Sequence, residues 1–181
     1  MIAIETKLKG CFVLEPQIFY DNRGYFFESF NLNIFKSLTG VDINFVQDNE
    51  SRSSRGVLRG LHYQKGEYAQ AKLVRVIEGA VLDVAVDLRR NSKTFGEYFS
   101  VELTEENKKQ LFIPRGFAHG FLVLSKEAKF SYKCDNFYNK ESEGGIIYND
   151  VSLNIDWLMN DSELIISEKD KKLPNLNTVK I

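Results

Sequence analysis

The chain has 181 residues, a length that fits one domain with a sizeable hydrophobic core. Lys and Arg total 24 against 25 Asp and Glu, so no basic excess points to nucleic acid and no acidic tail points to disorder. The N-terminus does not have the pattern of a signal peptide, and no apolar run approaches the roughly 18 residues of a membrane span. We therefore expect one domain over residues 1–181 that is cytoplasmic and does not bind a membrane.

In chain order, the sequence is dominated by short segments rich in β-branched and aromatic residues. These predict strands at 11–14, 25–30, 43–47, 57–63, 72–77, 80–87, 98–103, 110–113, 117–124 and 128–134. One short helix is predicted at 32–38, with Asn31 as its N-cap and Gly40 near its C-terminal end. The segments 72–77 and 80–87, joined by Glu78 and Gly79, have the pattern of a β-hairpin.

About ten short strands at near-regular spacing predict an all-β sandwich or barrel, and a barrel leaves room for one small ligand. Segment 80–87 has two partly apolar faces. Leu82, Val84 and Val86 share one face, whereas Asp83 and Asp87 alternate with small apolar residues on the other. This pattern is expected where sheets pack on both sides or where a partner subunit covers the outer face.

The two cysteines, Cys11 and Cys134, lie far apart and belong to no CxxC motif. A disulfide between them is left open, although reduced thiols are the simpler interpretation for a cytoplasmic protein. Neither cysteine has an electropositive motif beside it, and the chain has no Gly-x-Ser-x-Gly, GxGxxG or Walker A motif. Nucleophilic catalysis and these two nucleotide-binding loops are therefore not indicated.

His62 and His119 are the only histidines. Histidine has an unperturbed pKa of about 6.5, which suits proton transfer near neutrality. Taken singly, each could equally be a structural or surface histidine. The chain lacks a His-x-His pair, a common metal-binding pattern, so we expect no metal and no cofactor. A metal site built from both histidines and acidic residues is the less favoured alternative.

Several long motifs occur in order between about residues 10 and 173. They are DNRGYFFE at 21–28, FVQDNES at 45–51, GVLRGLH at 56–62, KLVRV at 72–76, FIPRGFAHGF at 112–121, YKC at 132–134 and ISEKD at 166–170. On these motifs the chain resembles the dTDP-4-dehydrorhamnose 3,5-epimerases. The resemblance implies a cupin-type jelly-roll barrel (a double-stranded β-helix) and an enzyme of dTDP-rhamnose biosynthesis that inverts C3 and C5 of dTDP-4-dehydro-6-deoxy-D-glucose without a cofactor.

The resemblance also implies a role for each of four catalytic residues. His62 would be the general base that removes a proton from the sugar, and Asp170 would pair with it and hold its tautomer and charge. Tyr132 would return a proton from the other face of the ring. Lys72 would steady the oxyanion that forms on the keto oxygen.

Ten further residues are implied to bind the nucleotide sugar. They are Arg23 and Arg59 at the diphosphate, Gln47 and Asn49 at the nucleotide or phosphates, Tyr138 and Phe26 beside the thymine ring, and Glu28, His119, Glu143 and Lys169 in the remaining shell. In such enzymes the N-terminal strands cross to a partner subunit. We therefore expect a homodimer in which Arg23, Phe26 and Glu28 enter the neighbour's site.

The chemistry of these residue types agrees with the implied reaction. A ketone at C4 acidifies the C–H bonds at C3 and C5, and inversion needs a base on one face and an acid on the other. A lysine ammonium stabilises an enolate where its charge develops, and arginine forks suit a diphosphate. Taken singly, Tyr132 and Tyr138 could be strand aromatics, Lys72 an edge lysine, Gln47 to Asn49 a turn, and Asp170 a helix cap. Their occurrence together, in order, favours the site.

One geometric difficulty concerns Arg59 and His62, which are three residues apart and would point to opposite faces of a regular strand. We expect Gly60 to provide a bulge or twist that brings both to one site. Two other classes of function remain: an epimerase of the same fold that acts at one carbon or on another nucleotide, and a non-catalytic cupin that binds a nucleotide sugar. Either would be favoured if the base lacked its acid.

Overall fold

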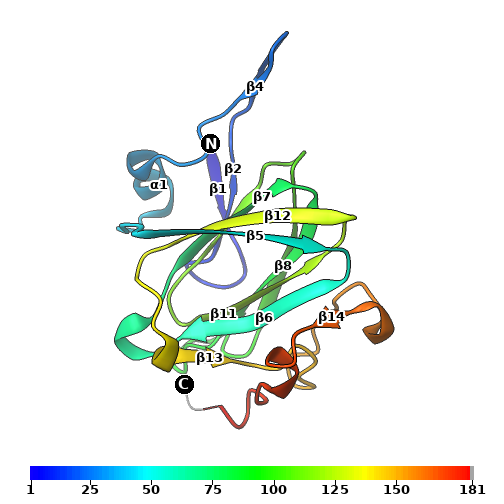
Figure 1. Cartoon of the computed structure of the whole chain (residues 1–181). Helices are drawn as coiled ribbons and strands as arrows, with labels where there is room; N and C mark the ends of the chain where they lie inside the picture. The colour runs from blue at the N-terminus through cyan, green and yellow to red at the C-terminus, as the bar shows by residue number, and fades with distance from the viewer. Residues whose placement is uncertain (180–181) are drawn as a thin grey trace.

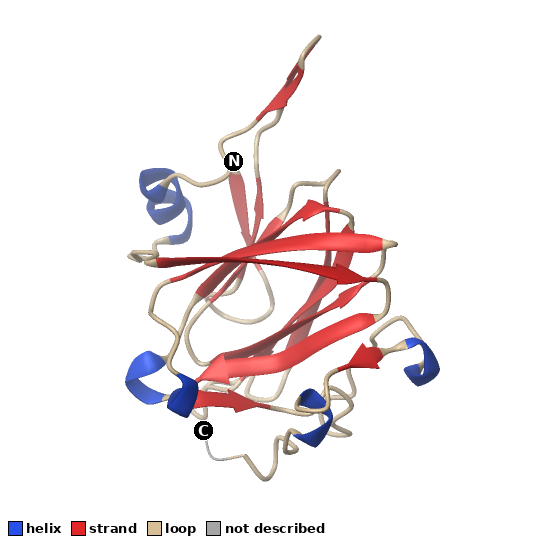
Figure 2. Cartoon of the chain, in the orientation of Figure 1, coloured by secondary structure: helices blue, strands red, loops and turns tan. Residues whose placement is uncertain are grey.

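The structure, a computed structural model, describes residues 1–179 and consists mainly of two facing β-sheets that form a barrel (Figure 1, Figure 2). The first sheet contains, in spatial order, β1 (Ile2–Glu5), β2 (Phe12–Glu15), β10 (Gln110–Ile113), β7 (Lys72–Glu78), β12 (Glu127–Cys134) and β5 (Gln47–Ser54). The second contains β13 (Glu143–Gly145), β6 (Val57–Gln64), β11 (Phe117–Val123), β8 (Ala80–Asp87) and β9 (Tyr98–Thr104), with β14 (Ile165–Ile166) parallel to β6. The predicted all-β fold is confirmed.

A separate two-stranded arm, β3 (Phe19–Asp21) and β4 (Gly24–Phe26), projects from the barrel at the end where the N-terminus lies (Figure 1). The remaining elements are the helix α1 (Leu32–Thr39) and the 3-10 turns η1 (Gly66–Tyr68), η2 (Lys140–Ser142), η3 (Asp161–Glu163) and η4 (Asp170–Lys172). Within residues 1–179, no helix is long and apolar enough to cross a membrane.

The helix α1 begins and ends where its capping residues predict. The Asn31 side chain accepts hydrogen bonds from the backbone N–H groups of Asn33 and Ile34, at 3.0 and 3.2 Å. Gly40 adopts a left-handed conformation with φ of 71° and donates its N–H to the Lys36 carbonyl. The helix buries Phe35 against Phe112 on the outer face of the first sheet, so that part of the sheet is covered by the chain itself.

Most predicted strands are confirmed, but two predictions are wrong. Segment 43–47 is not a strand before Gln47, and segment 25–30 is extended only as far as Phe26. The prediction missed β5, whose sequence QDNESRSS is entirely polar yet pairs with β12 from Gln47↔Cys134 to Ser54↔Glu127. Its inward-facing side chains line a cavity rather than an apolar core, so the hydrophobic periodicity that marks most strands is missing.

The predicted hairpin between segments 72–77 and 80–87 is also wrong. Both strands exist, but β7 pairs with β10 and β12 in the first sheet, whereas β8 pairs with β11 and β9 in the second. Gly79 makes the corner between the sheets with φ of 82°, and a Cβ there would lie 2.1 Å from the Glu127 carbonyl oxygen. The predicted tight turn at Gly79 is confirmed, but a tight turn does not determine which strands pair with the two segments that it joins.

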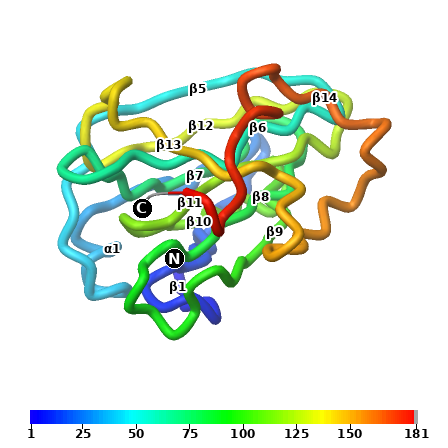
Figure 3. The backbone as a smooth tube through the Cα atoms, turned by 90° about the horizontal axis from the view of Figure 1, so that it is seen from below, coloured from blue at the N-terminus to red at the C-terminus, as the bar shows by residue number. Residues whose placement is uncertain are grey.

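The outer face of β8 is covered by the C-terminal part of the same chain. Leu82, Val84 and Val86 belong to a buried cluster with Ile146 and Trp157. Figure 3 shows the segment after β13, coloured yellow to red, running across the second sheet. The two apolar faces of β8 are therefore explained within one protomer and do not themselves call for a partner subunit.

The two cysteines are free and buried. Burial raises the pKa of the Cys11 thiol to about 12 and that of Cys134 to about 11, so both are protonated near neutrality. The alternative of a disulfide between them is wrong.

Candidate active site

Two adjoining cavities lie between the sheets and collect most of the predicted site residues. The main cavity, of about 680 Å³, is lined by Asn49, Arg59, His62, Lys72, His119, Tyr132, Lys169 and Asp170, among others. The side cavity, of about 280 Å³, shares Asn49, His62, Lys72 and Tyr132 and adds Gln47, Tyr138 and Glu143. All predicted site residues except those of the N-terminal arm and the segment after it therefore line one or both of these adjoining cavities.

His62, on β6 of the second sheet, is paired with a buried carboxylate. Its Nε2 lies 2.8 Å from Oδ1 of Asp170, and the other carboxylate oxygen accepts from the Gly60 backbone N–H at 3.3 Å. Burial acts to raise the pKa of Asp170, but the hydrogen bonds and charge around it, chiefly those of His62, hold it below its usual range. An ionised Asp170 fixes the orientation of His62 and favours a proton on Nε2. The alternative that Asp170 caps a helix is wrong, because the N-cap residue of η4 is Lys169 and no side chain caps that turn.

Arg59 and His62 reach the same cavity because β6 is irregular between them. The pairing of β6 with β11 shifts register between His119 and Phe121, as in a β-bulge. Gly60 has φ of 131°, and a Cβ there would lie 2.6 Å from the Gly120 Cα, so only glycine permits this close approach of the strands. The expectation that Gly60 resolves the three-residue spacing is confirmed.

Tyr132 and Lys72 come from the first sheet and therefore face His62 from the opposite wall. Tyr132 lies on β12, and the Lys72 ammonium, on β7, is 5.6 Å from the centre of its ring. β7 is an inner strand of its sheet, so the alternative of an edge lysine is wrong. Burial raises the pKa of the Tyr132 hydroxyl and lowers that of Lys72. Tyr132 therefore keeps its proton near neutrality and can donate it.

A hydrogen-bonded chain borders the side cavity. Gln47 donates to Asn49 at 3.0 Å and accepts from the Tyr138 backbone N–H at 3.1 Å. The Tyr138 hydroxyl donates to Glu143 at 3.1 Å, and the Lys169 ammonium lies 2.6 Å from the other oxygen of that carboxylate. Burial acts to raise the pKa of Glu143, but Lys169 and Tyr138 hold it below its usual range. Gln47 and Asn49 lie on β5, so the alternative of a turn there is wrong.

His119 is hydrogen-bonded to Asp83, a residue that the sequence analysis did not assign to the site. Its Nε2 lies 2.9 Å from Oδ2 of Asp83, a fully buried residue on β8. His119 itself is buried and lies opposite His62 in the pairing of β11 with β6. The signal was present in the sequence, because Asp83 is a single charge within the otherwise apolar run from residue 80 to 86.

Arg23, Phe26 and Glu28 lie outside both cavities. Arg23, in the turn of the arm, pairs with Asp21 at 2.5 Å, and Phe26 is 69% exposed. Glu28 accepts a hydrogen bond from the Asn31 side chain at 3.2 Å. The structure therefore does not bring these three residues together with His62 within one protomer.

The donor set of the cavities does not resemble a metal site. Among residues 1–179, no group of three or more His, Cys, Asp or Glu side chains is arranged to hold a metal ion. Nε2 of His62 and Nε2 of His119 each lie within hydrogen-bond distance of a carboxylate oxygen. That the protein works without a metal stays a prediction.

The two facing sheets and the enclosed cavity define a cupin-type jelly roll, the fold of the solved structures that this chain matches. The family model described as dTDP-4-dehydrorhamnose 3,5-epimerase matches residues 5–178. The chain belongs to this family.

Individual relatives resemble the chain over nearly its full length. The dTDP-4-dehydrorhamnose 3,5-epimerase of Escherichia coli (strain K12) is 54% identical over 177 residues, which are 98% of this chain and 95% of the relative. The crystal structure of the same-named enzyme from Elizabethkingia anophelis is 58% identical, with a TM-score of 0.94 over 97% of this chain and 96% of that one. A Legionella pneumophila dTDP-6-deoxy-D-glucose-3,5-epimerase in complex with dTDP-4-keto-L-rhamnose is 48% identical, with a TM-score of 0.94 over 98% and 94%.

Proposed function

We propose that this protein inverts C3 and C5 of dTDP-4-dehydro-6-deoxy-D-glucose to give dTDP-4-dehydro-L-rhamnose. One observation carries the proposal: His62 on one sheet, paired with Asp170 of η4, faces Tyr132 and Lys72 on the other sheet across a single cavity. The activities of the relatives and the nucleotide sugar bound to the Legionella enzyme support this substrate class.

The mechanism follows from the protonation of these groups. Nε2 of His62 is engaged by Asp170, so Nδ1 is the nitrogen that takes the proton from C3 or C5. The electrons of the C–H bond move to the C4 oxygen, and Lys72 stabilises the resulting enolate. Asp170 stabilises the imidazolium that forms. Tyr132 then gives its proton to the same carbon from the opposite face, and exchange with solvent resets both groups before the second inversion.

The nucleotide part is assigned to the rim of the cavities. Arg59 lines the main cavity and donates a hydrogen bond from Nε to the Ser53 hydroxyl at 3.2 Å. Its guanidinium group binds a phosphate oxygen. Tyr138, which is 53% exposed beside the side cavity, stacks on the thymine ring. Gln47, Asn49, His119, Glu143 and Lys169 provide the other polar contacts, and the whole chain acts as one domain.

The expected product is tested directly by incubating the protein with dTDP-4-dehydro-6-deoxy-D-glucose and following the sugar by proton NMR. The ring couplings of the product are expected to be those of the L-rhamno configuration, because both carbons flank the C4 ketone and both are acidified. A product inverted at one carbon only would favour the narrower epimerase. Tight binding of the substrate with no conversion would favour a non-catalytic sugar-nucleotide-binding protein.

The proposal includes a homodimer in which the arm of each copy completes the site of the other. The arm is rich in exposed aromatic side chains, among them Phe19, Tyr20 and Phe26, which a partner would cover. Its residues Arg23 and Phe26 line neither cavity of their own protomer. Light scattering should give about twice the 20.8 kDa mass of the chain.

Shared sites predict complementation between two inactive variants. In a mixed dimer of Arg23→Ala and His62→Ala copies, one site has both native residues and the other has neither. After unfolding and refolding an equimolar mixture, we expect about a quarter of the wild-type activity, since half of the dimers are mixed and each has one intact site. Each variant refolded alone is the control. A mixture no more active than its parents, or a fully active monomer, would contradict the shared site.

A further inference from the structure

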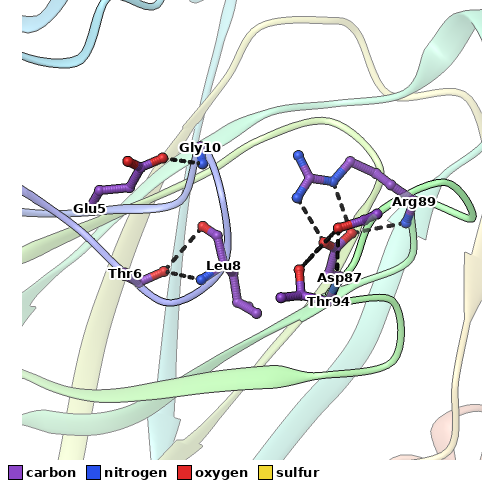
Figure 4. Close-up of polar contacts among 8 residues, drawn as sticks. Glu5, Thr6, Leu8, Gly10, Asp87, Arg89 and Thr94 are labelled. Atoms are coloured by element: carbon purple, nitrogen blue, oxygen red, sulfur yellow. Dashed lines mark hydrogen bonds and ion pairs between the residues drawn. The ribbon is translucent and has the colours of Figure 1, made fainter.

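Strand β8 carries two carboxylates that are fully buried, Asp83 and Asp87, but only one of them is satisfied by the fold. Asp87 accepts hydrogen bonds from the backbone and side chain of Arg89 and from the hydroxyls of Ser92 and Thr94, all between 2.6 and 3.0 Å (Figure 4). Burial acts to raise the pKa of Asp87, yet these bonds lower it to about 2. Asp87 therefore has a structural role: it holds the loop that follows β8.

Asp83 lies four residues earlier on the same face of β8, inside the barrel. Its Oδ2 contacts His119, but Oδ1 is buried without a hydrogen-bond partner among the residues that the structure describes. The neighbouring positions on this face, Val81 and Ala85, belong to the apolar core. A buried carboxylate with an unsatisfied oxygen destabilises a fold, and an apolar residue of similar size would pack there at lower cost. Stability alone does not account for Asp83.

The charges around Lys72 suggest what Asp83 does. The titratable groups whose charge acts on Lys72 are Asp83 on β8, Cys134 on β12 and Glu143 on β13. The other titratable groups that share its cavities are Glu50, Arg59, His62, Tyr63, His119, Tyr132, Tyr138, Lys169 and Asp170. Tyr132 and Cys134 are neutral near pH 7, because burial raises the pKa of both. Glu143 is paired with Lys169, and Asp170 with His62.

Two carboxylates act on the charge of Lys72, Asp83 and Glu143, and Glu143 is already paired with the Lys169 ammonium. His119, the partner of Asp83, is neutral near pH 7, because burial lowers the pKa of the imidazole more than Asp83 raises it. A neutral His119 that donates from Nε2 to Asp83 has no proton on Nδ1. Removal of Lys72 from water disfavours its ammonium, and a nearby carboxylate opposes that effect.

We propose that Asp83 is a positioning residue for the reaction at the keto oxygen: its hydrogen bond fixes the tautomer of His119, and its negative charge balances the Lys72 ammonium. The inference rests on the proposed function and extends it from the groups that line the cavity to the buried carboxylate beneath them. Asp83 does not contact the sugar. It sets the proton on His119 and the charge on Lys72, both of which line the main cavity.

The test is the pH dependence of kcat in Asp83→Asn. Asparagine keeps the shape and an oxygen that accepts from His119, but it removes the charge. Without that charge Lys72 loses its proton at a lower pH, so the alkaline limb of kcat should move down by about one pH unit or more. We expect kcat at its optimum to fall at least about tenfold. The Kd for dTDP should change less than about twofold, because the nucleotide contacts are untouched.

Asp87→Asn is the matched control, since it removes the other buried carboxylate from the same face of the same strand. It should lower Tm because it breaks the Arg89 network, while the alkaline limb stays at the wild-type pH. A double variant gives a second readout: in a Lys72→Met background, Asp83→Asn should lower kcat no further, because its effect passes through Lys72. Additive losses, or an unmoved limb in a folded Asp83→Asn protein, would overturn the inference.

The wild-type protein supplies a measurement that does not depend on any variant folding. With only two histidines, the ring nitrogens of His119 can be resolved by ¹⁵N NMR. Between pH 6 and 8 we expect a neutral ring with its proton on Nε2; a proton on Nδ1 in this range would overturn the assignment. If the wild type did not epimerise the substrate, the proposed function would fail while the tautomer could still be as expected. Normal epimerisation with the wrong tautomer would overturn only the role of Asp83.

Discussion

His62→Ala is expected to lower kcat by about 10²–10⁴-fold, the range typical for loss of a general acid or base. The other histidine of the main cavity is poorly suited to take its place, because His119 is buried and burial lowers the pKa of its imidazole. Asp170 is held in the ionised form but is buried behind His62. The measurement is the initial rate of conversion of dTDP-4-dehydro-6-deoxy-D-glucose, followed by NMR at saturating substrate.

The binding of dTDP separates loss of catalysis from loss of the site. Arg59, Gln47 and Tyr138 remain in His62→Ala, so its Kd for dTDP should stay within a few-fold of the wild-type value. Circular dichroism and Tm should confirm that the barrel is intact. Turnover close to the wild-type rate in a folded His62→Ala protein would refute His62 as the base.

Tyr132→Phe is expected to separate proton removal from inversion. The change removes one hydroxyl and keeps the ring against Phe130 and beneath the Lys72 ammonium, so packing should change little. His62 can still remove the proton, but the hydroxyl that would protonate the carbon from the opposite wall is gone. In deuterated water the recovered sugar should therefore contain deuterium in its original configuration, while the doubly inverted product falls by about 10²-fold or more.

Tyr148→Phe is the matched control for this experiment. Tyr148 is also partly buried, and it packs on the cluster outside the second sheet, away from the cavities. Its loss of a hydroxyl should leave both exchange and inversion at wild-type rates. If Tyr132→Phe behaved in the same way, Tyr132 would be only a core aromatic. If exchange and inversion both disappeared, Tyr132 would act in binding or in stabilising the enolate, and the division of roles would be wrong.

Local sequence chemistry predicted those features of the fold that depend on near neighbours. Asn31 and Gly40 set the ends of α1 through backbone hydrogen bonds within one turn. Gly79 was recognised as a tight turn, but whether it joins two strands of one sheet or two sheets depends on contacts with β10, β11 and β12, far away in the sequence. β5 was missed because a strand that lines a polar cavity lacks apolar alternation.

The site shows the same division. The resemblance carried by the long motifs is enough to place residues such as His62 and Lys72 in one site. The bulge at Gly60 was suggested by the spacing of Arg59 and His62, but its register shift depends on Gly120 in another strand. Asp83 was visible only as a charge in an apolar strand, because its partner His119 is 36 residues away.

The most direct test of the central claim is proton NMR of the wild-type protein with dTDP-4-dehydro-6-deoxy-D-glucose in deuterated water. The claim is that one base and one acid, on opposite walls, act in turn at both carbons beside the ketone. We expect the signals of H3 and H5 both to disappear as the product forms, since each new proton comes from solvent through Tyr132. Product that retains its original hydrogen at either carbon, or no exchange at all, would show that the two groups do not act in turn at both carbons.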